Sequence, residues 1–173
     1  MGKVIVMNGI TLDGVMQGPA RSDEDTRDGF AHGGWGIPYG DETTVAKMGE
    51  RMGGDRAWLF GRRTYEGVLA AWNARGGPFK EALNDSRKYV ASSNPATRLE
   101  WPNSTLLHGD VPAAVADLKQ SSAANLVIMG SGVLIASHGR RLDRRVPSDD
   151  FSSGAGHRPA AVCRWQLYTA AAS

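Results

Sequence analysis

Apolar residues along this chain occur in short continuous runs, and longer amphipathic segments separate most of these runs. A short apolar run bounded by glycine or polar residues predicts a strand that is buried on both faces of a parallel sheet. Five segments have this pattern: KVIVMNG at 3–9, RAWLF at 56–60, RKYVASS at 87–93, STLLHG at 104–109 and NLVIMG at 125–130.

Amphipathic segments between these runs predict helices. They are DETTVAKMGERMGG at 41–54, GRRTYEGVLAAW at 61–72, VPAAVADLKQ at 111–120 and SGVLIAS at 131–137. In the first of them, Asp41 is a suitable N-cap and Gly53 can end the helix. Because strands alternate with helices, the chain predicts an α/β domain in which helices flank a mostly parallel central sheet. The stretch from Ile10 to Gly40 has neither pattern, and loops of that length in compact domains are usually functional or mobile.

Length and composition are those of a single globular domain. The chain has 173 residues, of which 41% are hydrophobic and 22% charged, and this size allows a substantial core. No apolar run is long enough to span a bilayer, and the first residues lack the long apolar stretch of a signal peptide. The single Cys163 cannot form an internal disulfide. These features favour a cytoplasmic protein with no membrane partner.

Charge is distributed unevenly along the chain. Residues 1–137 carry 14 Lys and Arg against 15 Asp and Glu, whereas residues 138–173 carry six Arg and three Asp and contain no Lys, Glu, Ile, Met or Asn. A basic tail can indicate nucleic-acid binding. This one lacks the lysine clusters and interleaved aromatic residues of such tails, so we predict no nucleic-acid partner.

Two predicted strands end in glycine and lead directly into helices, at Gly61 and at Gly130. A helix N-terminus offers unpaired N–H groups and a partial positive charge, and glycine lets an anion approach the backbone. Arg62 and Arg63 add charge beside the first turn, and Ser131 adds a hydroxyl at the second. Two such turns at one sheet edge suggest a bound dinucleotide. Each turn can also be plain turn geometry, and paired arginines are often only a solvated face.

Three segments carry a resemblance to a known family: ITLDGVMQGP at 10–19, WLFGRRTYEGVLAAW at 58–72 and NLVIMGSGVLIAS at 125–137. Together they resemble the dihydrofolate reductase-like superfamily, and within it the C-terminal reductase domains of the riboflavin-biosynthesis deaminase-reductase and their stand-alone bacterial relatives. The resemblance runs in order over residues 1–137. It implies a dihydrofolate reductase-like fold, NADPH as cofactor, a small-molecule substrate and, as often in the family, a homodimer.

The resemblance also implies roles for individual residues. The residues that it places on NADPH are Thr11, Gly61, Arg62, Arg63, Thr64, Ser92, Gly130, Ser131, Gly132 and Val133. Asp13 and Gly14 would face the substrate. Trp35 is expected on the substrate side for a different reason: a loop tryptophan flanked by glycines is not typical of a core, so we expect it to cover the pocket. An aspartate before a glycine is also a common turn former, so Asp13 has a structural alternative.

The chemistry implied is transfer of a hydride from nicotinamide to a bound acceptor, while the protein supplies position and excludes water. No catalytic residue is assigned. His32 and His108 have no metal-ligand partners at useful spacing, so no metal is expected. The substrate expected is a small heterocycle, pyrimidine- or pterin-like, as in the aminouracil reductase step of riboflavin synthesis. The alternatives are another dihydrofolate reductase-like oxidoreductase and a nucleotide-binding remnant without catalysis.

The resemblance ends near Ser137, because the family continues with an IDEY-like strand start and a P-x-V-L-G-x-G-x-x-L-F hairpin that this chain lacks. Codons permitted for residues 142–166, LDRRVPSDDFSSGAGHRPAAVCRWQ, can be read one base later as SIDEYRLMIFPLVLGTGRRLFADG. We therefore hypothesise that residues from about His138 onward arise from a frameshift; a genuine divergent tail is the alternative. On this hypothesis residues 1–137 form an incomplete reductase domain that lacks its C-terminal strands. Residues 138–173 would then be a disordered tail with few contacts to the first strand, and this copy would be weak or inactive.

Overall fold

The computed structural model describes residues 3–11, 14–40, 55–138, 142–143 and 164–170. The chain divides into two compact units. Unit 1 comprises Met1–Met7, Gly54–Arg145 and Tyr168–Ser173, and unit 2 comprises Asn8–Gly53 and Val146–Leu167. The helix predicted at 41–54 lies outside the described residues.

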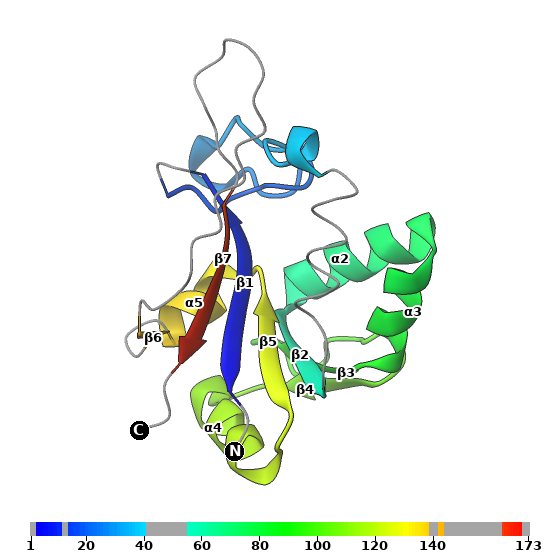
Figure 1. The fold of residues 1–173 in the computed structure, drawn as a ribbon, viewed down its shortest axis with the longest axis vertical. Helices are drawn as coiled ribbons and strands as arrows, with labels where there is room; N and C mark the ends of the chain where they lie inside the picture. Colours follow the sequence, from blue (N-terminus) through cyan, green and yellow to red (C-terminus); the bar gives the residue numbers. More distant parts are fainter. Residues whose placement is uncertain (1–2, 12–13, 41–54, 139–141, 144–163, 171–173) are drawn as a thin grey trace. The chain divides into compact units, whose positions relative to one another are not determined.

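The central sheet has the strand order β4-β3-β2-β5-β1-β7-β6 (Figure 1). Its strands are β1 (Val4–Ile10), β2 (Arg56–Gly61), β3 (Arg87–Ala91), β4 (Ser104–Leu107), β5 (Asn125–Met129), β6 (Leu142–Asp143) and β7 (Arg164–Ala170). The pairs that join β4, β3, β2, β5 and β1 are all parallel, whereas β6 and β7 pair antiparallel. All five strands predicted from apolar runs are present, and the mostly parallel α/β fold class is confirmed.

Helices cover both faces of the parallel strands. They are α2 (Arg62–Arg75), α3 (Pro78–Asp85), α4 (Val111–Ser121) and α5 (Gly132–His138). One face of the sheet packs Leu59 and Ile128 against Val115 of α4 and Leu134 of α5. On the other face, the rings of Trp58 and Phe60 stack with their centroids 5.8 Å apart. The Phe60 ring also packs against the Tyr65 ring of α2, with 6.3 Å between the two centroids. Burial on both faces explains why these strands appear as continuous apolar runs.

Helix α3 was not predicted from the sequence, and a buried lysine completes its C-terminal end. Lys88 of β3 is only 1% exposed, and its Nζ donates to the carbonyl oxygens of Leu83, Asn84 and Ser86 at 2.5, 3.1 and 2.7 Å. Helix ends leave such carbonyls without intrahelical partners, so the ammonium supplies what the helix lacks. Burial lowers the pKa of Lys88 to about 8, and the nearby Asp85 carboxylate acts in the opposite direction.

The described part of unit 2 is mostly loop, with two short 3-10 helices, η1 (Arg27–Gly29) and η2 (Ile37–Tyr39). Backbone bonds close the loop on itself: the N–H groups of Gly34 and Gly36 donate to the oxygens of Gly18 and Pro19 at 2.7 and 2.9 Å. Gly36 is needed there because an added Cβ would lie 2.8 Å from the Pro19 oxygen. The glycine-rich composition of this stretch therefore reflects close backbone approach within the loop.

An ion pair adds to this loop, because the Arg27 guanidinium bonds to the Asp25 carboxylate. This contact lowers the pKa of Asp25 to about 2.

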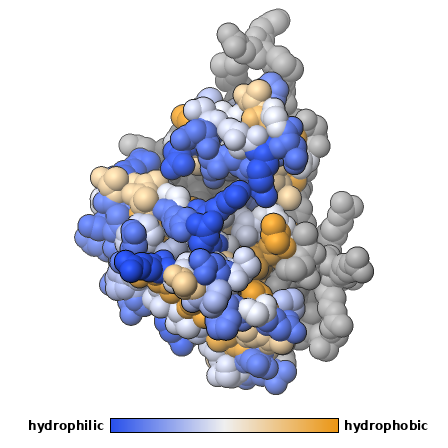
Figure 2. Space-filling model, turned by 180° about the vertical axis from the view of Figure 1, so that it is seen from behind, coloured by the Kyte–Doolittle hydropathy of each residue, from blue (hydrophilic) through white to orange (hydrophobic). Residues whose placement is uncertain are grey.

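Large exposed hydrophobic side chains are few in the described residues, namely Met16, Ile37 and Val133. In Figure 2, hydrophobic colour accordingly appears in small areas among hydrophilic residues.

The C-terminal segment was expected to be a disordered tail with few contacts to the first strand. Two short parts of it form strands, since β7 lies next to β1 in the sheet and β6 pairs with β7. The physical reason is that β1 offers an open ladder of N–H and C=O groups, and a segment with aromatic and β-branched residues can pair with it. Residues 144–163 lie outside the described residues, so the disorder expected for them stays a prediction. The division into a reductase domain at 1–137 and a separate tail at 138–173 also stays a prediction.

Candidate functional site

The two glycine turns lie at the carboxyl ends of adjacent parallel strands. β2 pairs with β5 in a register that aligns Leu59 with Ile128. β2 ends at Gly61 and leads directly into α2, while β5 ends at Met129 and is followed by Gly130, Ser131 and α5. The geometry predicted from the sequence, two strand–glycine–helix turns at one sheet edge, is therefore present.

The two turns are in contact with each other. An added Cβ at Gly61 would overlap Ser131 Oγ and would lie 3.2 Å from Ser131 Cβ. Gly61 has an ordinary extended backbone, with φ −77° and ψ 152°. The requirement for glycine there is consequently one of space and not of backbone conformation.

On the other side of the contact, Gly130 has φ +61°, and an added Cβ would lie 3.0 Å from Thr64 Cγ2. Glycine is thus favoured at Gly130 on both counts. Ser131 also has a positive φ of 60°, which is costly for a residue with a side chain. Its carbonyl oxygen accepts a bond from the Ile135 N–H at 3.1 Å, so the left-handed pair leads straight into α5.

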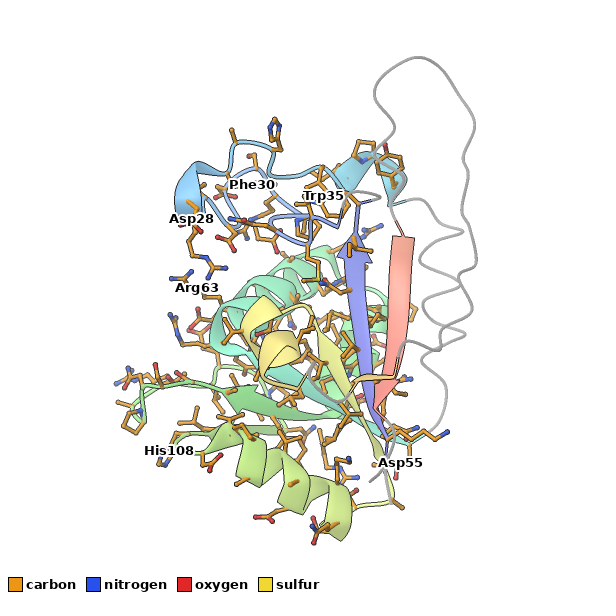
Figure 3. All side chains as sticks on the ribbon, turned by 90° about the vertical axis from the view of Figure 1, so that its left-hand side faces the viewer. Asp28, Phe30, Trp35, Asp55, Arg63 and His108 are labelled. Carbon is orange, nitrogen blue, oxygen red and sulfur yellow. The ribbon has the colours of Figure 1, made fainter. Side chains whose placement is uncertain are left out.

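The first turn of α2 is positively charged and has no side-chain cap. Gly61, the N-cap residue, has no side chain to accept the helix amides, and the first turn contains no acidic residue. Arg62 and Arg63 begin the helix, and both side chains are exposed. Figure 3 shows Arg63 projecting from this end of α2. Free N–H groups and two guanidiniums are groups that bind anionic oxygen.

The two arginines differ in their contacts. Arg62 Nη1 donates to both carboxylate oxygens of Glu66, at 2.9 Å each. Arg63 makes no ion pair or hydrogen bond to any described residue. Glu66 was not singled out in the sequence, although its i,i+4 spacing from Arg62 is the signal that could have identified it.

Three further residues of unit 1 are expected to contact the cofactor: Ser92, Gly132 and Val133. Gly132 and Val133 open α5, and Val133 is 72% exposed. Ser92 is half-buried, and its Oγ shares a hydrogen bond with Thr97 Oγ1 at 2.8 Å and accepts one from the Asn94 N–H at 3.2 Å. Ser92 therefore holds its own loop together, and its role at a cofactor stays a prediction.

Residues expected on the nicotinamide and substrate side belong to unit 2. Thr11 is buried, and its Oγ1 accepts from the Val15 N–H at 2.9 Å in a turn that includes Gly14, which has φ +90°. Trp35 is half-buried, and its Nε1 donates to the Gln17 oxygen at 2.7 Å, so it braces the loop. Asp13 lies outside the described residues.

The part of the chain that the structure describes contains no group of three His, Cys, Asp or Glu side chains arranged to hold a metal ion. Within that same part, no helix is both long enough and apolar enough to cross a bilayer.

The chain is similar to known proteins at the level of solved structures. No family model matches the chain, and no curated protein matches it. Among solved structures it is similar to a dihydrofolate reductase from Enterococcus faecalis complexed with NADP(H) and RAB-propyl, with 15% identity, a TM-score of 0.40, and coverage of 73% of this chain and 79% of that one. A likeness at this level carries no conclusion about function.

Proposed function

We propose that this chain is an NADPH-dependent reductase of a small heterocyclic, pyrimidine- or pterin-like substrate, and that unit 1 holds the phosphates of the cofactor. One observation carries the proposal: the Gly61 and Gly130 turns contact each other at the carboxyl ends of adjacent parallel strands. Open α/β sheets bind nucleotides at that edge, with phosphate at helix N-termini.

The residues of this edge fit a phosphorylated dinucleotide. The uncapped amides of α2 and the exposed Arg62 and Arg63 supply donors and positive charge. Gly130 and Ser131 turn the backbone sharply, and Ser131 adds a hydroxyl donor beside Gly61. A diphosphate held along this edge would be fixed by backbone groups, so the chain would position the cofactor without requiring a metal.

When bound, NADPH supplies a hydride, that is, two electrons and one proton, to an electrophilic carbon of the acceptor. A second proton is needed to complete the reduction of a C=N or C=O bond. We assign no residue to that transfer; Asp13, expected on the substrate side, is the first residue to test. The contribution of unit 1 is to bind and orient the cofactor.

Cofactor preference tests the proposal. We expect the full chain to bind NADPH more tightly than NADH, and the double variant Arg62→Ala with Arg63→Ala to lose that preference. A charged bidentate contact of this type is worth about 1.5–3 kcal/mol. Arg87→Ala is the matched control, because Arg87 is exposed at the opposite, amino end of β3. Equal binding of both cofactors, or an equal loss in the control, would contradict the assignment.

A nucleotide-binding protein without catalysis is the second candidate. The composition of residues 138–173 favours it, since that segment lacks the pattern expected of a reductase C-terminus. The two candidates differ in turnover: a reductase oxidises NADPH in the presence of a suitable pyrimidine or pterin, whereas a non-catalytic protein binds NADPH with no substrate-dependent oxidation.

A further inference from the structure

Three enclosed N–H donors near the amino end of β2 have no hydrogen-bond acceptor among the described residues. They are Nε and Nη1 of Arg56 and Nε1 of Trp58, and each atom is almost wholly shielded from solvent. Arg56 Cζ lies 5.7 Å from the centroid of the Trp58 ring, and Trp58 is only 2% exposed. Buried donors in native proteins are nearly always satisfied, and a bound ion or ligand is one way to satisfy them.

The Arg56 guanidinium also lacks a counter-ion. None of the Asp and Glu residues that the structure describes is buried, and Asp55, next to it in the chain, is 74% exposed and pairs with Arg87 at 3.7 Å. Burial lowers the pKa of Arg56 below its ordinary value, with no opposing contribution from a carboxylate of the described residues. Lys88, the register partner of Trp58 on β3, adds a second buried positive charge. Because an unpaired buried charge is costly, this end of the sheet favours an anion.

These donors lie away from the turns proposed to hold the nucleotide. Arg56 is the first residue of β2 and Gly61 is the last, and the rise of a strand separates their Cα atoms by about 16 Å. Figure 3 shows Asp55, directly before Arg56, at the other end of the sheet from Arg63. A ligand at Arg56 would therefore bind independently of the proposed nucleotide.

We propose that Arg56 and Trp58 form a binding site for a small carboxylate. Nε and Nη1 lie side by side on one edge of the planar guanidinium, which matches the two oxygens of a carboxylate. The indole N–H supplies a third donor, and the ring beside it offers an apolar surface to the rest of the ligand. A dianionic phosphate would lose more hydration on burial than a monoanion, so a carboxylate fits better.

Enclosure of the donors sets the kind of ligand. A side chain of another protein could reach them only by opening the domain, whereas a small molecule needs only a limited movement of Arg56. Arg56 as a whole residue is half-buried, so its side chain connects the enclosed donors with solvent. The ligand is accordingly a free small molecule and not part of a partner protein.

Acetate is the probe, and the protein is the full 173-residue chain, purified without carboxylate buffers. Thermal unfolding in sodium acetate is compared with unfolding in sodium chloride at equal ionic strength and in acetamide, which has the same shape without the charge. A ligand that binds only the folded state raises the Tm as its concentration rises. We therefore expect acetate to raise the Tm above both references. In an isotopically labelled sample, the indole N–H signal that is missing from Trp58→Phe should shift as acetate is added.

The variants separate the parts of the site. Arg56→Met should weaken acetate binding about tenfold or more. Without acetate it should be at least as stable as wild type, because it removes an unpaired buried charge. Trp58→Phe, which loses one neutral donor, should weaken binding about fivefold. Arg75→Met is the matched control: Arg75 Cζ lies 5.1 Å from the Trp72 ring centroid, but Arg75 is exposed, so the response to acetate should remain.

Each result decides for or against the site. Acetate that acts no differently from chloride, in both the Tm and the indole signal, overturns the proposal and leaves Arg56 as a structural cation. An acetate effect that persists in Arg56→Met, or that is lost equally in Arg75→Met, also overturns it. If inorganic phosphate shifts the indole signal as strongly as acetate, the assignment to carboxylates is wrong. Should Arg56→Met fail to fold, Arg56→Lys, which keeps the charge but lacks the fork, takes its place and should likewise lose the acetate-dependent shift.

Discussion

Contact between the two glycine turns can be tested directly, because a side chain at Gly61 would collide with Ser131 and with no other described residue beyond its chain neighbours. Among the described residues other than its chain neighbours, an added Cβ there meets only Ser131 Oγ and Ser131 Cβ within 4 Å. Since the backbone of Gly61 is extended, alanine introduces no conformational strain of its own. Crowding of this kind in a packed region costs about 1–3 kcal/mol. We therefore expect Gly61→Ala to lower the free energy of unfolding by that amount.

A second substitution, Ser131→Gly, should reverse the loss of stability caused by Gly61→Ala. Ser131→Gly removes both atoms that the new Cβ meets and relieves the positive φ of residue 131. A left-handed conformation costs a non-glycine residue about 1–2 kcal/mol, while glycine loses about 0.5–1 kcal/mol more conformational entropy on folding. Ser131→Gly alone should therefore change stability by less than about 1 kcal/mol. The double variant should recover most of the loss caused by Gly61→Ala.

Urea unfolding of wild type, the two single variants and the double variant gives the coupling energy between the positions. We expect a favourable coupling of at least about 1 kcal/mol, which lies above the additivity error for independent sites. Additive effects, or a Gly61→Ala variant as stable as wild type, would refute the tight contact, because the Ser131 hydroxyl would then turn aside without cost. The dinucleotide site proposed at this edge would then lose its structural basis.

Three further predictions concern the same turn, the buried lysine and the reading frame. Gly130→Ala should destabilise by about 1–3 kcal/mol, because it adds positive-φ strain and a Cβ 3.0 Å from Thr64. Gly132→Ala, where no atom of the described residues would lie within 4 Å of the added Cβ, should be neutral or slightly stabilising, and equal losses in both variants would refute this explanation. Lys88→Met should cost about 2–4 kcal/mol, because three carbonyls lose their donor. The folded-state pKa of Lys88, about 8, is below the ordinary 10.5, so between these values the unfolded chain binds more protons. Wild type should therefore gain stability relative to Lys88→Met as pH rises from about 8 to 10.5, and a pH-independent difference between them would contradict the lowered pKa. The frameshift hypothesis predicts that the gene, read one base later across the codons for Leu142 to Gln166, encodes a family-like segment such as SIDEYRLMIFPLVLGTGRRLFADG; a shifted frame without the IDEY-like start and the P-x-V-L-G-x-G-x-x-L-F motif would refute it.

The site could be predicted from the sequence as far as local pattern determines it. Gly61 and Gly130 could be predicted at turns, because each follows the end of an apolar run and precedes the start of an amphipathic segment. The contact between Gly61 and Ser131 was not visible, since it depends on the register of β2 against β5. The difference between Arg62 and Arg63 was also missed, because side-chain direction at a helix start decides which arginine reaches Glu66.

Outside the site, two elements could not be predicted from the sequence, because each has a weak local pattern and depends on contacts with a neighbouring strand. Helix α3 was missed because PFKEALND is only eight residues long and is completed by Lys88 from the next strand. β7 was missed for a related reason: a seven-residue segment at the end of an Arg- and Ala-rich tail has little tendency to form a strand alone. It is placed next to β1, whose unpaired edge can accept any segment able to extend. Pairing at that edge requires only backbone groups, so the strand by itself does not distinguish a tail encoded in frame from one produced by a frameshift.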